Sequence, residues 1–173
     1  LEHFVKTGRI LPYQEISASQ NYTFSEDFKL TGQHFTVQDT DGNVLYTVDG
    51  TVPLVKLRVL DSYDREVFAM TKQLGHALAT YKFYQDGEVY GTLEKQFDLV
   101  RDRFTMEVTE GKLELREYSG TVGHNYKVTL NGEMLGAIMD DMDLTVENAV
   151  FDNAYLIVYR PDKLPLLVCM AVM

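Results

Sequence analysis

The sequence of 173 residues contains no tryptophan and a single cysteine, Cys169. One cysteine excludes a disulfide within the chain, and the opening stretch LEHFVKTGRI shows neither the apolar region nor the cleavage site of a secretion signal. A reduced, cytoplasmic location is therefore predicted. Because Leu, Val and Met surround Cys169, we expect it to be a small buried hydrophobe rather than a nucleophile.

Basic residues are scarce as well. The chain has 16 Lys and Arg residues against 26 Asp and Glu residues, which gives a formal net charge of −10 at pH 7. Phosphate backbones repel such a chain on average, and no local basic stripe offsets this repulsion. Nucleic acids are therefore excluded as predicted partners.

A long apolar run is also missing. The most apolar stretch, LPLLVCMAVM, covers only residues 164–173, whereas a helix that crosses a bilayer needs about 20 apolar residues. Arg160, Asp162 and Lys163 interrupt the sequence just before it. We therefore predict no transmembrane segment. A membrane anchor is the weakest interpretation of this stretch, and a partner-binding tail or a buried core element remains.

Catalytic and metal-binding motifs are lacking too. The four histidines have no metal-ligand spacing; they are His3, His34, His76 and His124. Neither a G-x-S-x-G elbow nor a glycine-rich phosphate loop is present. The acidic group Asp140-Asp141-x-Asp143 could offer oxygen ligands to Ca²⁺, but it lacks EF-hand spacing, and a solvated acidic loop is the favoured interpretation. The sequence predicts no enzyme, no cofactor and no metal site.

What the chain does contain is period-two alternation, as where Phe104, Met106 and Val108 face one way. Turn-forming pairs interrupt it every eight to twelve residues or so. They include Asp41-Gly42, Asp86-Gly87, Glu110-Gly111 and Asn131-Gly132. Asp-Gly and Asn-Gly favour tight hairpins because both positions tolerate positive φ. We predict roughly ten to twelve strands in an all-β sandwich or barrel, with one domain over residues 21–173 and an N-terminal extension or edge element over residues 1–20.

The final stretch breaks the alternation. Asp162 could cap a helix, and Pro165 falls in its first turn, where the missing N–H is harmless. A helix that is apolar on every side must be surrounded by other apolar groups, and in a β protein the inside of a closed sheet offers that surrounding. We therefore predict that Leu164–Met173 forms a buried helix.

Four stretches resemble the LURP-one-related proteins, bacterial members of the YxjI type included. They are FTVQDTDGNVLYTVDG (residues 35–50), LRVLDSYDREVFAM (57–70), GHNYKVTLNGEMLGAIMD (123–140) and DNAYLIVYRPDKLPLLVCMAVM (152–173). The resemblance runs from about Tyr22 to Met173. It implies a Tubby C-terminal-like fold, a closed antiparallel β-barrel of about twelve strands around a central hydrophobic C-terminal helix. The chain departs from usual members at Asp64-Arg65, where an Asp-Gly turn is expected, and it ends early in the helix.

Five basic residues form the remaining functional lead. Lys56 and Arg58 share one face of a predicted strand, and Arg101 and Arg103 share another, with Lys95 before them. Two such pairs could hold a phospholipid headgroup, although outward-facing Lys and Arg also protect sheet edges. The Tubby relatives of this family are similar to phosphoinositide-tethered, membrane-associated adaptors, but the basic cluster that holds the headgroup in Tubby proteins is not recognisable in this sequence.

The sequence therefore suggests a non-enzymatic binding or adaptor barrel, cytoplasmic and peripheral to a membrane, whose partner is a phospholipid headgroup or a protein. Two alternatives stay open. One is a small-ligand-binding protein or enzyme with a cleft at the mouth of the barrel. The other is a protein–protein interaction module with an exposed sheet edge.

Overall fold

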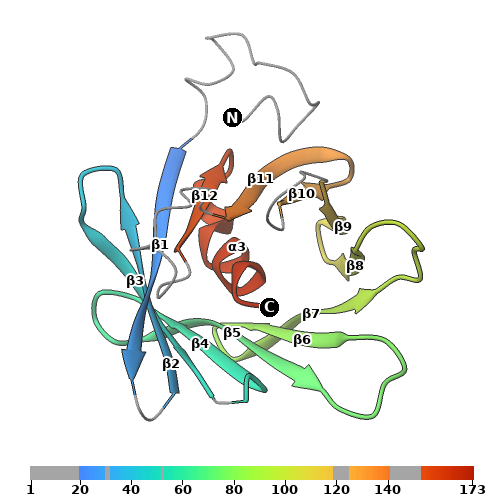
Figure 1. Cartoon of the computed structure of the whole chain (residues 1–173), viewed down its shortest axis with the longest axis horizontal. Coiled ribbons are helices and arrows are strands. Elements are labelled where there is room, and N and C mark those ends of the chain that lie inside the picture. The colour runs from blue at the N-terminus through green and yellow to red at the C-terminus, as the bar shows by residue number, and fades with distance from the viewer. Residues whose placement is uncertain (1–19, 30–31, 52, 119–124, 141–152) are drawn as a thin grey trace, which may run out of the picture.

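The computed structural model in Figure 1 describes residues 20–29, 32–51, 53–118, 125–140 and 153–173. The first strands are β1 (Gln20–Lys29), β2 (Gly32–Asp39), β3 (Val44–Gly50), β4 (Lys56–Leu60), β5 (Glu66–Gln73) and β6 (Thr80–Gln85). The others are β7 (Glu88–Lys95), β8 (Arg103–Val108), β9 (Gly111–Glu117), β10 (Tyr126–Leu130), β11 (Glu133–Asp140) and β12 (Asn153–Val158). A 3₁₀ turn, η2 (Pro161–Lys163), leads into one helix, α3 (Leu164–Ala171). A mainly β fold with antiparallel strands and a C-terminal helix, as predicted, is confirmed.

Period-two alternation sorts the strand side chains as the sequence predicted. In β4, Leu57 and Val59 are fully buried while Lys56 and Arg58 are exposed. The tight hairpins also form where Asp-Gly and Asn-Gly stand, because Asp86-Gly87 and Asn131-Gly132 both take positive φ. Asp64 takes a φ of 58° at the turn where the family pattern led us to expect Asp-Gly. An aspartate tolerates this left-handed conformation better than most residues, so the turn forms without glycine at that position.

Each strand pairs with its sequence neighbour, and β1 pairs with both β2 and β12. The strand order thus returns on itself as a closed barrel. The pairing is uneven, however, since β7 and β8 share only two register pairs, Glu94 with Thr105 and Lys95 with Phe104. Six such pairs join β8 to β9. The contact between β7 and β8 is therefore a narrow seam in the sheet.

The helix α3 lies within the ring of strands (Figure 1). Its buried residues are Leu164, Leu166, Leu167, Val168, Cys169 and Met170. Leu167 reaches the backbone of β11 at Gly136, where a β-carbon on the glycine would lie 2.8 Å from a Leu167 methyl group. The predicted buried helix is confirmed, and it ends at Ala171. Pro165 stands in its first turn, but Asp162 does not cap it and binds Arg160 instead.

Two ends of the barrel differ in how they connect the strands. At the turn end, short connections such as residues 86–87, 109–110 and 131–132 join β6 to β7, β8 to β9 and β10 to β11, and residues 159–163 lead into α3. At the loop end, residues 74–79 and 96–102 join β5 to β6 and β7 to β8. Because successive strands run antiparallel, α3 begins at the turn end and its last residues lie at the loop end.

Two predictions concern residues outside the described ranges. The extension or edge element predicted for residues 1–20 falls there except for Gln20, the first residue of β1. The acidic group predicted as a solvated loop falls there from Asp141 onward.

Candidate functional site at the loop end of the barrel

The five predicted headgroup residues do not form one cluster. Lys56 and Arg58 lie on β4, which β5 and β6 separate from β7, where Lys95 stands. The Arg58 guanidinium Nη2 lies 3.7 Å from the Asp49 carboxylate Oδ2 on the neighbouring strand β3. The sequence correctly placed Lys56 and Arg58 on one face, but it could not show a carboxylate across the strand pair.

The other three predicted residues are divided between two faces of the sheet. Arg103 lies on the outer face, where its Nε and Nη2 donate to Glu114 Oε2 at 3.0 and 2.6 Å. Lys95 points the opposite way, and its Nζ lies 2.6 Å from Asp102 Oδ1. Arg101 is exposed in the loop between them. Whether any of these residues holds a headgroup stays a prediction, and the structure gives Arg103 and Lys95 carboxylate partners of their own.

Lys95 and Asp102 stand at the rim of a cavity of about 400 Å³ at the loop end. Its walls include the buried side chains of Phe104, Leu115 and Met170. The Lys95 ammonium lies over the Phe104 ring, with Nζ 5.8 Å from the ring centroid. The cavity therefore combines one ion pair at its rim with apolar and aromatic walls, which is the usual composition of a small-molecule site.

Two tyrosines add hydroxyl groups to this lining. Tyr81 packs against Phe104 with ring centroids 6.3 Å apart, and Tyr126 lies on β10. Burial raises the pKa of Tyr81, and the nearby Lys95 ammonium opposes that rise. Tyr81 is therefore a neutral hydroxyl group at physiological pH, and it can offer a hydrogen bond without adding charge.

The two loops beside the cavity expose large apolar side chains. Phe97, Leu99 and Val100 expose 80%, 87% and 83% of their surface, and Leu74 exposes 76%. The loops adjoin each other, since the Lys95 backbone N–H donates to Ala79 C=O at 2.8 Å. Sequence reasoning missed this feature. The signal was a break in alternation in QFDLVR, residues 96–101, where three apolar residues stand in a connection and not in a strand.

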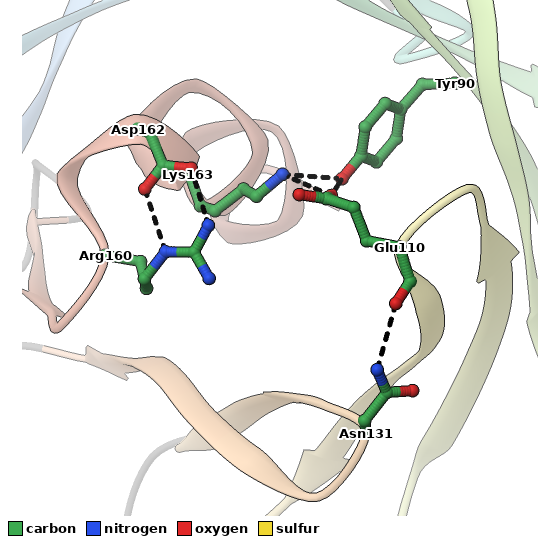
Figure 2. Close-up of polar contacts among 6 residues, drawn as sticks. All are labelled: Tyr90, Glu110, Asn131, Arg160, Asp162 and Lys163. Atoms are coloured by element: carbon green, nitrogen blue, oxygen red, sulfur yellow. Dashed lines mark hydrogen bonds and ion pairs between the residues drawn. The ribbon is translucent and has the colours of Figure 1, made fainter.

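The turn end carries a different cluster, shown in Figure 2. The Lys163 ammonium forms an ion pair with the Glu110 carboxylate and contacts the Tyr90 hydroxyl at 3.4 Å. Glu110 in turn accepts from the Tyr90 hydroxyl at 3.4 Å and offers its backbone C=O to Asn131 Nδ2 at 2.9 Å. Residues from η2, β7 and two hairpin turns are thereby tied together where α3 enters the barrel.

Electrostatics explain why this cluster holds its charges. The hydrogen bond from Lys163 lowers the pKa of Glu110, whereas burial raises the pKa of Tyr90. Burial alone would lower the pKa of Lys163, but the interactions with Glu110 and Tyr90 together outweigh burial, and the pKa rises. A small cavity of about 210 Å³ lies beside the cluster, lined by Tyr90, Lys163 and Pro165 among others. The cluster therefore fastens the start of the helix to the sheet.

Charge is distributed unequally between the ends. Many carboxylates lie at the turn end, either in a turn or on a strand residue next to one. They are Asp39, Asp41, Asp61, Asp64, Glu66, Asp86, Glu88, Glu107, Glu110, Glu133 and Asp162. The basic residues in the same segments are Arg65, Lys112, Arg160 and Lys163. In and beside the two loops of the loop end, the acidic residues are Glu94, Asp98 and Asp102, and the basic residues are Lys72, Lys95, Arg101 and Arg103. The turn end is strongly acidic, whereas acidic and basic residues are nearly equal in number around these two loops.

In the described part of the chain, no group of three or more His, Cys, Asp or Glu side chains could hold a metal ion. No helix in that part is long and apolar enough to cross a membrane. Cys169 is buried inside α3, and burial raises the pKa of its thiol well above the usual value.

The fold and the loop end together define a class, a mainly β protein whose sheet surrounds one C-terminal helix and whose apolar loops flank a cavity. The chain belongs to the LURP-one-related family, whose sequence model matches residues 21–173. Its structure is similar to a crystal structure of a protein from Arabidopsis thaliana, with a TM-score of 0.54 and 12% sequence identity. That similarity covers 88% of this chain and 90% of the plant chain, and it concerns the fold alone. The comparison with curated proteins finds no match.

Proposed function

We propose that this protein is a non-enzymatic binding barrel that attaches reversibly to a lipid surface through its loop end. The observation that carries the proposal is the group of apolar side chains on the two loops, above all Phe97, Leu99 and Val100. In this proposal the protein is a cytoplasmic, membrane-peripheral member of the Tubby C-terminal-like class, bacterial members of which it resembles. A phospholipid, not a nucleic acid, is its partner.

The arrangement of these side chains supports insertion between lipid headgroups. Three of them occupy four consecutive positions of one loop, and Leu74 and Leu78 stand on the adjoining loop. Transfer of a Phe, Leu or Val side chain out of water gains roughly 1.5–3 kcal/mol when it is complete. Partial insertion of three such side chains is therefore sufficient for reversible attachment. Side chains that expose four-fifths of their surface project from the body, as an inserting loop requires.

The charge distribution supports an orientation. Cytoplasmic membrane leaflets carry a negative surface potential, which repels the acidic turn end. In the segments around the two apolar loops, acidic and basic residues are nearly equal in number, so repulsion there is weaker than at the turn end. Arg101 follows Val100 directly and can contact lipid phosphates once the apolar side chains have entered.

Apolar insertion differs from the headgroup site predicted from the sequence in its response to salt. Attraction between exposed charges is screened within about 10 Å at 0.1 M salt. Insertion of Phe97, Leu99 and Val100 is driven by the hydrophobic effect, which salt does not screen. The proposal therefore expects binding to neutral vesicles that persists when salt is raised.

The test is flotation of the full chain with phosphatidylcholine vesicles, with and without an anionic lipid. We expect wild-type protein to float with both, and the variant F97S/L99S/V100S to lose at least about tenfold in bound fraction because the inserting side chains are gone. The matched control is V44S/Y63S/V89S, which replaces three exposed apolar residues of the turn end. This control should float like the wild type.

Other outcomes would point elsewhere. If neither vesicle binds wild-type protein, attachment to lipid is wrong, and a protein partner for the loop end becomes the better explanation. If binding needs anionic lipid and the R101S/R103S variant removes it, the headgroup prediction from the sequence is correct instead.

A further inference from the structure

The rim of the loop-end cavity presents a donor and an acceptor side by side. Lys95 comes from the end of β7 and Asp102 from the residue before β8, and their charged atoms lie 2.6 Å apart. About a third of each side chain is exposed, 33% for Lys95 and 39% for Asp102. The pair therefore borders solvent on one side and the cavity on the other. It can release one hydrogen bond to an entering group without becoming buried and unpaired.

The walls below this rim are apolar. Phe104 and Leu115 come from β8 and β9, Ile138 from β11, and Met170 from the helix. All four side chains are at least nine-tenths buried. Phe104 is held at one side by Tyr81 and at the top by Lys95. A methionine side chain adapts to irregular ligands because its chain is unbranched and polarizable. This lining suits an aliphatic or aromatic tail, not a polar one.

We infer that this cavity binds one uncharged, single-chain amphipath, such as a long-chain alcohol or amide. The tail lies among Phe104, Leu115 and Met170, and the head lies between Lys95 and Asp102. The volume of about 400 Å³ is within the range of small-molecule sites, roughly 300–1,000 Å³. The inference does not rest on attachment to a lipid surface, because the cavity is open to ligands in solution.

The ion pair at the rim sets the preference for an uncharged head. A hydroxyl or amide group both donates and accepts, so it can accept from Lys95 and donate to Asp102 at once. A carboxylate head would meet the Asp102 carboxylate at close range, and an ammonium head would meet the Lys95 ammonium. Like charges at such distances repel. The pair therefore selects against both charged heads while accepting the uncharged one.

Three probes that share one tail test this inference: octan-1-ol, octanoate and octylammonium. Each is titrated into the full chain without vesicles, and binding is followed by NMR of methionine methyl groups. We expect octan-1-ol to bind most tightly and to shift the Met170 methyl signal. Met134 packs in a separate small cluster with Ala137 and Ile157, so its signal should not move.

Substitution of either rim residue should change the order of the probes. In K95M the Asp102 carboxylate stands alone, and octylammonium should become the tightest ligand by about tenfold. In D102N the Lys95 ammonium stands alone, and octanoate should become the tightest by a similar factor. The matched control R103M breaks the ion pair with Glu114 on the outer face, and the order of probes should stay that of the wild type.

A variant that fills the cavity provides a second test. A171F places a ring into the cavity and should abolish binding of all three probes while the melting transition persists. If A171F does not fold, A79L fills the rim from the β5–β6 loop and serves the same purpose.

The inference is overturned if octan-1-ol leaves the Met170 signal unmoved at saturating concentration. It is also overturned if K95M and D102N keep the wild-type order of probes. Either result leaves vesicle flotation and its loop variants unaffected, so failure of this site and failure of lipid attachment are separate outcomes.

Discussion

The two ends of the barrel connect the same strands in different ways. At the turn end, hairpins of two central residues and an ion pair between Lys163 and Glu110 tie the start of α3 to the sheet. At the loop end, connections of six and seven residues hold apolar side chains in solvent beside a cavity. The turn end is acidic and tied by bonds between its own residues, whereas the two loops of the other end gather exposed apolar side chains in one place.

This difference suggests that the turn end contributes mainly to stability and the loop end mainly to binding. At the turn end, ion pairs within the chain hold the carboxylates of Asp61, Glu110 and Asp162. Apolar side chains of the loop end make few internal contacts, so their loss should cost little in folding. Large apolar side chains gathered in an exposed position are better explained by a partner than by the fold.

The largest effect should come from the helix that joins the two ends. L167A removes a fully buried side chain beside Gly136, and we expect a loss of about 3 kcal/mol in the free energy of unfolding because a cavity remains in the core. Urea denaturation measures it. The comparison is L99A at the loop end, which should change stability by less than about 0.5 kcal/mol. Equal losses would show that the exposed loop is part of the core.

A turn-end hairpin residue should have an intermediate effect. N131A removes two hydrogen bonds, from the Lys112 backbone N–H at 2.9 Å and to the Glu110 C=O at 2.9 Å. It also places alanine at a φ of 52°, which suits asparagine better. We expect a loss of about 1–2 kcal/mol in thermal or urea unfolding. The loop-end control is Q96A, which removes one exposed hydrogen bond to the Glu94 C=O. It should cost only a few tenths of the loss expected for N131A. A loss in Q96A as large as in N131A would contradict the division.

The smallest effect should depend on pH. E110Q removes the partner of the half-buried Lys163, and we expect a loss of about 1 kcal/mol at pH 7. The pKa of Glu110 is lowered in the folded protein from its usual 4.5, so its contribution is complete above pH 4.5 and disappears as the pH falls through the folded-state pKa. Wild type and E110Q should therefore converge in acid. D102N at the loop end should cost less at pH 7, because its ion pair is more exposed. A difference between wild type and E110Q that persists at pH 2 would exclude the ion pair as its cause.

Alternation and turn chemistry made the strands predictable. In β8, Phe104 and Met106 face the core as the period of two requires, and Asn131-Gly132 forms the tight hairpin that the pair favours. The helix was predictable because LPLLVCMAVM has no polar face and can only be buried. These features depend on local sequence, so local sequence is sufficient to find them.

The site was less predictable because it depends on residues far apart in the chain. Lys95 and Arg103 look like one basic cluster in the sequence, but Lys95 pairs with Phe104, so Arg103, the residue next to Phe104, points to the opposite face. Their carboxylate partners, Asp102 and Glu114, lie seven and eleven residues away, and only the strand register brings Glu114 to Arg103. The Lys163–Glu110 pair spans 53 residues and has no local signal at all.

The position of α3 in the chain also constrains how the protein is made. The twelve strands of the described residues all precede the helix that fills them, and β1 closes the sheet by pairing with β12. Strands that leave the ribosome early must therefore wait without their core, and pairing between the first and last strands is slow because a long loop must close. During that delay the apolar faces of β2 to β11 are open to other chains. Chaperones that cover these faces should therefore raise the yield of folded protein.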